Sequence, residues 1–73
     1  MENFKLFDVI ALTVDIPEYD LPRGQVGTIV EILAKGKAFE VEFADREGHT
    51  FECIGVEPEQ MMVLRYKHEF VAA

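Results

Sequence analysis

The chain contains no tryptophan, only one cysteine, and no apolar run near the roughly 20 residues that a membrane-spanning helix needs. The single cysteine, Cys53, excludes an internal disulfide and fits a reducing cytoplasm. The N-terminus also lacks the basic and apolar segments of a signal peptide. With 73 residues there is no room for a second domain. We therefore expect one cytoplasmic domain, residues 1–66, followed by a short tail, residues 67–73.

Basic residues are scarce, and this scarcity restricts the class of partner. Seven basic residues stand against fourteen acidic ones, which gives a formal net charge of −7. A nucleic-acid binder must neutralise phosphates with lysine and arginine, and here these residues are few and scattered. The composition thus argues against direct binding of DNA or RNA. An acidic surface would attract a basic protein partner, although it would also serve solubility alone.

Short apolar segments separated by turn residues recur along the chain at near-regular spacing, which is typical of a small sandwich or barrel. The third segment alternates most clearly, with Phe39, Val41 and Phe43 on one face and glutamates on the other. The pattern predicts five strands, over residues 6–13, 25–33, 39–43, 49–56 and 61–66.

Turn chemistry joins these strands. Pro17 and Pro22 keep the first loop, residues 14–24, out of regular sheet. Residues 34–37 and 45–48 read as hairpin turns, and Gly48 is free to take a positive φ. Residues 57–60 are predicted to form a single 3₁₀ turn, because Pro58 suits the first position of a helical turn. This order predicts an all-β fold, a five-stranded SH3-like barrel. The rival, an oligonucleotide-binding-type barrel, usually needs more residues and a helix between its third and fourth strands.

Four segments carry a resemblance to a known family: FDVIALT at residues 7–13, LPRGQVGTIVE at 21–31, FEVEF at 39–43 and QMMVL at 60–64. Together they resemble a family of small bacterial proteins known only as a domain of unknown function. The resemblance implies an SH3-like barrel without known catalytic residues. Genes of similar proteins often neighbour toxin-like or nuclease-like genes, which implies an antitoxin or immunity role. The chain is also distantly similar to the KOW motif, whose proteins bind RNA through basic loops that are absent from this sequence.

The candidate metal ligands, nucleophiles and phosphate-binding glycines do not have the spacing that these functions need. His49 and Cys53 are four apart on an expected strand, hence roughly 13 Å apart at about 3.3 Å per residue. They can share neither a zinc ion nor a nucleophile–base contact, and Cys53 is expected to be a small apolar side chain in or near the core. Gly24 and Gly27 open a strand rather than a helix, unlike a phosphate-binding loop, and indicate a tight entry with a bulge or close approach. We expect no metal, no cofactor and no enzymatic activity.

A mixed acidic and apolar face is the first candidate binding surface. Glu40 and Glu42 point outward from the third strand, and the same phase is expected for residues of the two flanking strands: Glu31, Glu52, Ile29, Leu33 and Ile54. An apolar patch rimmed by charge is a mark of an interface. The alternative is a solvated face.

The first loop is the second candidate surface. It carries a tyrosine flanked by acids: Asp15, Glu18, Tyr19 and Asp20. In SH3-like domains this segment edges the ligand groove, and its chemistry here suits a basic or proline-containing peptide. The alternative is that Tyr19 covers the open end of the barrel. Proline-rich grooves usually rely on a tryptophan, which this chain lacks, so true SH3-type ligand recognition is not expected.

These observations favour a non-catalytic protein-interaction module, of antitoxin or immunity type, that binds a basic protein. The alternative is a small accessory subunit of a larger enzyme or redox complex. A homo-oligomer is compatible with both.

Overall fold

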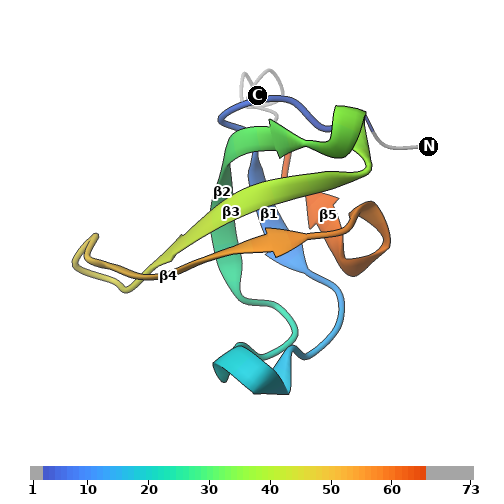
Figure 1. Cartoon of the computed structure of the whole chain (residues 1–73). Helices are drawn as coiled ribbons and strands as arrows, with labels where there is room; N and C mark the ends of the chain where they lie inside the picture. The colour runs from blue at the N-terminus through green and yellow to red at the C-terminus, as the bar shows by residue number, and fades with distance from the viewer. Residues whose placement is uncertain (1–2, 66–73) are drawn as a thin grey trace, which may run out of the picture.

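The computed structural model describes residues 3–65, which form five strands and three short 3₁₀ helices (Figure 1). The predicted all-β fold, with a 3₁₀ turn directly before the last strand, is confirmed. No helix in this part of the chain is long and apolar enough to cross a membrane. The strands are β1 (Val9–Leu12), β2 (Val26–Leu33), β3 (Ala38–Ala44), β4 (Thr50–Val56) and β5 (Met61–Val63), and the 3₁₀ helices are η1 (Pro17–Tyr19), η2 (Ala34–Gly36) and η3 (Pro58–Gln60).

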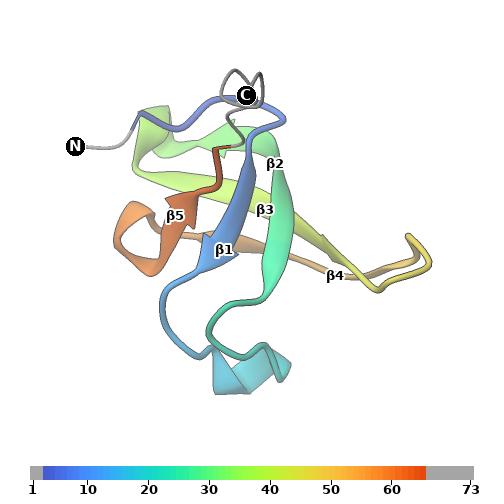
Figure 2. The ribbon, with the colours of Figure 1, turned by 180° about the vertical axis from the view of Figure 1, so that it is seen from behind.

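All five strands belong to one antiparallel sheet with the order β4-β3-β2-β1-β5. The pairing of β5 with β1 sets Val63 opposite Ile10 and so brings the last strand back to the first. Figures 1 and 2 show β3 and β4 crossing over β1 and β5, so that the sheet folds upon itself. The two halves of the bent sheet therefore enclose the core between them.

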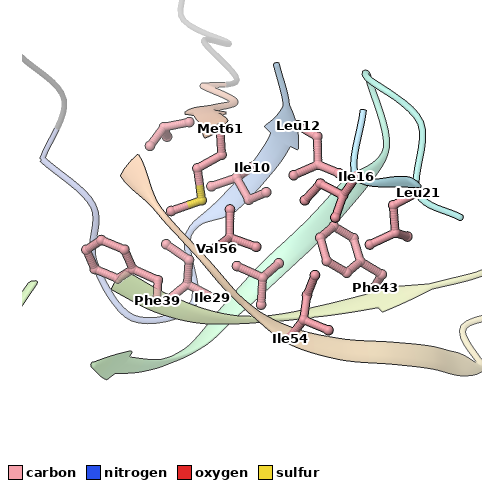
Figure 3. Close-up of a cluster of buried hydrophobic side chains, with 12 residues drawn as sticks. Ile10, Leu12, Ile16, Leu21, Ile29, Phe39, Phe43, Ile54, Val56 and Met61 are labelled. Carbon is pink, nitrogen blue, oxygen red and sulfur yellow. The ribbon is translucent and has the colours of Figure 1, made fainter. Parts of the chain in front are cut away.

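The core lies between these halves and consists of hydrophobic side chains (Figure 3). Phe39, Val41 and Phe43 of β3 are buried, which confirms the alternation predicted for this strand. Among the described residues, no polar or charged side chain is buried. From the N-terminal segment, the ring of Phe4 packs against that of Phe39, with their centroids 5.3 Å apart. Burial of this apolar surface is the main term that stabilises so small a domain.

The first and last strands are shorter than predicted. Residues 6–8 are not in β1, because Leu6 and Phe7 form a turn in which Phe7 has a φ of 70°. That turn is closed by hydrogen bonds in both directions between Lys5 and Asp8, from the Asp8 amide to the Lys5 carbonyl and from the Lys5 amide to the Asp8 carboxylate. β5 ends at Val63, and position 66 and the predicted tail, 67–73, lie outside the described residues.

Two 3₁₀ helices lie where the sequence indicated only a loop and a hairpin turn. In η1, Pro17 takes the first helical position, where its missing amide costs nothing. In η2, Ala34, Lys35 and Gly36 all have positive φ, which closes the β2–β3 hairpin. Gly48 in the second hairpin also has a positive φ, 88°, as predicted.

Gly27 marks a close approach between strands. A Cβ atom built on Gly27 would lie 2.7 Å from Cγ1 of Val41 and 2.8 Å from the Phe43 ring, closer than real Cβ atoms come. The β2 bulge lies further along, between Ile29 and Glu31. Gly27 is therefore required by the packing of β3 side chains, and not by a bulge.

Candidate interaction surfaces

Three glutamates gather on the outer side of β2 and β3. Glu31 is directly opposite Glu40, and Glu42 is directly opposite Cys53 of β4. Directly opposite residues of antiparallel strands have side chains on the same face of the sheet. We call the set Glu31, Glu40, Glu42 and Cys53 the acidic face.

The expected outward phase of Ile29 was wrong. Ile29 is fully buried in the core and pairs with Val41, whereas Glu31 faces outward. The bulge adds one residue, Val30, between them, and one extra residue reverses the side-chain phase of the strand. Simple alternation therefore placed Ile29 and Glu31 on the same face, and the real strand separates them.

The expected phase of β4 was also wrong, by one residue. Ile54 pairs with Val41 in the core. Glu52 pairs with Phe43 on the same inner side, but the Glu52 side chain is only half-buried there. Cys53 consequently points outward and is exposed, whereas the prediction had it as a small apolar side chain in or near the core. The two apolar residues Ile54 and Val56, both buried, were the signal in the sequence that could have set the correct phase.

Leu33 does lie on the outer side of the sheet. It pairs with Ala38 and is half-buried. Its Cδ1 atom would be 3.8 Å from a Cβ built on Gly55, which itself pairs with Glu40. Of the apolar residues expected beside the glutamates, Leu33 alone is in that place.

The carboxylates of the acidic face are oriented by neutral donors. The Cys53 thiol donates a hydrogen bond to Oε2 of Glu40 over 3.2 Å, and the Thr50 hydroxyl donates one to Oε2 of Glu42 over 2.6 Å. Within residues 3–65, no lysine or arginine lies within ion-pair distance of a carboxylate. The negative charge of the acidic face is thus not neutralised by basic residues of this part of the chain.

The acidic face also changes the acidity of the Cys53 thiol. The hydrogen bond to Glu40 is the main cause that raises the pKa of Cys53 to about 11, and partial burial and the charges of Glu40, Glu42 and Glu52 add to it. The thiolate is the reactive form of cysteine. At neutral pH Cys53 is therefore protonated and a poor nucleophile.

Replacing Glu40 by glutamine is expected to lower the pKa of Cys53, because a neutral amide oxygen accepts a weaker hydrogen bond from the thiol and does not repel the thiolate. The rate of alkylation by iodoacetamide, followed by mass spectrometry across pH, should rise and its midpoint should move to lower pH. The matched control is Glu47→Gln in the exposed β3–β4 hairpin. Identical pH profiles for wild type and Glu40→Gln would contradict the assignment.

The first loop borders an open hollow of about 360 Å³ lined by Asp15, Pro17, Asp20, Leu21 and Pro22. Asp15 holds the loop, since its Oδ1 accepts a hydrogen bond from the Arg23 amide over 2.7 Å. Two of the predicted loop residues, Asp15 and Asp20, are therefore brought together around one hollow, and this loop offers both carboxylate and apolar surface.

The other two predicted loop residues do not line the hollow. Glu18 and Tyr19 are on η1 and exposed. Ile16 and Leu21 are the loop residues that enter the core, and they bridge to each other across the loop. Tyr19 keeps 46% of its surface exposed, and so is not itself part of the buried core.

Asp45, Glu47 and His49 at the tip of the β3–β4 hairpin have ligand atoms within 4.8 Å of one another. Asp45 explains their proximity, because its Oδ1 accepts hydrogen bonds from the amides of Glu47 and His49. All three side chains are exposed. The cluster is a side-chain cap of the turn, and such geometry alone does not define a metal site.

Fold and surface define a small all-β domain with an acidic outer face and an acidic first loop. The family model described as a domain of unknown function (DUF4926) matches residues 6–63, and the chain belongs to this family. No curated protein matches the chain, and no solved structure does. The SH3-like and KOW-like similarities therefore stay predictions.

Proposed function

We propose that this domain is a non-catalytic protein-interaction module that binds a basic partner protein through its acidic face. The carrying observation is the cross-strand pair of Glu31 and Glu40, two like charges directly opposite each other with no lysine or arginine of residues 3–65 within ion-pair distance of either. Such a pair destabilises a sheet by a few tenths of a kcal/mol. A basic partner would neutralise the pair and would be steered to it during association.

The state of Cys53 supports a role without catalysis. A thiol with a pKa of about 11 is protonated in a neutral cytoplasm and does not act as a nucleophile. An exposed free thiol also persists best in a reducing compartment. This observation supports a cytoplasmic location as part of the proposal.

Within this class, an antitoxin or immunity protein is the leading form of the proposal. Such proteins bind a toxin or nuclease, and nucleases present basic surfaces to phosphates. The alternative is an accessory subunit of a larger enzyme or redox complex. In either form the first-loop hollow, with Asp15 and Asp20 at its edge, is a second contact for a basic or proline-containing peptide.

The double variant Glu40→Lys/Glu42→Lys is expected to slow association with the partner about tenfold at low salt, with less effect on dissociation. Raising the ionic strength to about 0.15 M should reproduce part of this loss in wild type, because the Debye length falls to about 8 Å. The control is Glu47→Lys/Glu59→Lys, at exposed sites off the acidic face. Each Glu→Lys change replaces a negative charge by a positive one, so both double variants have the same net charge.

The partner for these kinetics is obtained by affinity capture from the native host with all three proteins. A protein retained by wild type and control, but not by Glu40→Lys/Glu42→Lys, supports the proposal. A nuclease-like protein indicates the immunity form, and subunits of a complex indicate the accessory form. Equal association rates for both double variants would reduce the acidic face to a solubility device and direct attention to the first loop.

A further inference from the structure

The other half of the bent sheet has an apolar outer surface. Ile10 and Leu12 of β1 point into the core, so their neighbours Val9 and Ala11 point outward. β1 lies between β2 and β5, and Figure 2 shows the three strands side by side. Val9 and Ala11 have neighbours on the same outer surface. Thr28 and Val26 of β2 pair with them, Met62 of β5 pairs with Ala11, and the Leu64 amide donates a hydrogen bond to the Val9 carbonyl. We call the resulting set the apolar face: Val9, Ala11, Val26, Thr28, Met62 and Leu64.

Val26 and Met62 are the most exposed members of the apolar face, at 44% and 46%. They lie on either side of Ala11, which pairs with both. Two exposed apolar side chains separated only by an alanine form a continuous strip across three strands. Contiguous apolar strips of this kind mark interaction sites on small proteins more often than isolated exposed residues do.

The apolar face meets the acidic face at the pair of Thr28 and Glu42. At this meeting point lies a cleft of about 310 Å³, between the start of β2 and the end of β3. Its walls offer apolar surface, a hydroxyl, two carboxylates and one guanidinium, from Val26, Ala44, Thr28, Glu42, Asp45 and Arg46. The Glu42 carboxylate is held in place by the hydroxyl of Thr50. The cleft therefore has a negative net charge, because the carboxylates of Glu42 and Asp45 outnumber the guanidinium of Arg46.

We propose that the partner's docking segment is amphipathic, with apolar side chains that cover Val26 and Met62 and a lysine or arginine that enters the cleft beside Glu42. This inference rests on the proposed function and specifies the chemistry of the basic partner. Charge complementarity selects this occupant, because the cleft is acidic. A second copy of the chain would bring a net charge of −7 against the same carboxylates.

The test uses two synthetic peptides of equal length and equal positive charge. One alternates lysine with leucine, and the other has serine in place of each leucine. Binding to the full chain is followed by amide and methyl NMR spectra and by isothermal titration. The proposal expects the leucine peptide to bind about tenfold more tightly, with the largest shifts at Val26, Thr28 and Met62.

The variant Val26→Lys is expected to weaken binding of the leucine peptide about tenfold. Ile32→Lys is the matched control: Ile32 is in the same strand, is similarly exposed at 46%, and lies on the opposite face because it pairs with Phe39. Both variants change the net charge by the same amount. Ile32→Lys should change the affinity by less than about twofold.

Equal binding of the two peptides, no binding of either, or equal effects of Val26→Lys and Ile32→Lys would overturn the inference. A wild-type dimer that Val26→Lys dissociates would also overturn it, because a second copy of the chain would then cover the apolar face. NMR shifts at residues 66–73 caused by Val26→Lys in the free protein would overturn it too, because these residues would then be the occupant. One result separates this inference from the proposed function: Glu40→Lys/Glu42→Lys weakens binding of both peptides, and Val26→Lys weakens binding of neither. The acidic face would then still be the binding surface, and only the role of the apolar face would be wrong.

Discussion

Replacing Phe43 by alanine is expected to remove most of the domain's stability at room temperature. The side chain is fully buried among the core residues of both sheet halves (Figure 3). Deleting such a ring costs about 3–5 kcal/mol. A domain of this size lies near the lower end of the 5–15 kcal/mol that is typical of protein stability. Urea unfolding followed by circular dichroism should show the loss of most or all of the folded baseline.

The control for Phe43→Ala is Phe51→Ala, because Phe51 lies in β4 with 48% of its surface exposed. Its replacement should change the free energy of unfolding by no more than about 0.5 kcal/mol. If the two variants unfold at the same urea concentration, the inward phase of β3 is wrong.

Gly27→Ala is expected to destabilise the domain by about 1–3 kcal/mol, the usual cost of overpacking a core. The added methyl group would meet Val41 and Phe43, both with no exposed surface and therefore with little room to move. The measurement is again the free energy of unfolding in urea. Since β propensity alone favours alanine over glycine in a strand, a loss of stability here reports the close approach.

The control for this change is Gly55→Ala in β4. Its new methyl group would have only the Leu33 side chain nearby, at an ordinary contact distance of 3.8 Å. Gly55→Ala should be neutral or slightly stabilising. In addition, Phe43→Leu should reduce the cost of Gly27→Ala, because contacting sites are non-additive. Independent effects of Gly27→Ala and Phe43→Leu would contradict the contact.

Much of the fold was predictable because local chemistry decides it. The alternation of Phe39, Val41 and Phe43 set both the strand and its buried side, and Gly48 set the second hairpin turn. Pro58 set the 3₁₀ turn before β5. These features depend on residues near one another in the chain, and the sequence shows such residues directly.

The candidate site was predictable only in part. Glu31, Glu40 and Glu42 do gather on one outer face, and Asp15 and Asp20 do line one hollow. Cys53 on the acidic face and the cleft beside Glu42 were missed. Both result from the pairing of strands, which no single segment of the sequence specifies.

The class of fold, the strand segments and the excess of negative charge follow from the amino-acid sequence. Which side of β2 and of β4 meets solvent depends on how the strands pair. One extra residue in the bulge beside Ile29 reverses the strand phase, and the pairing of Ile54 with Val41 turns Glu52 inward and Cys53 outward. Side chains alternate with a period of two, so a shift of one residue exchanges core and surface, and only the partner strand fixes that register.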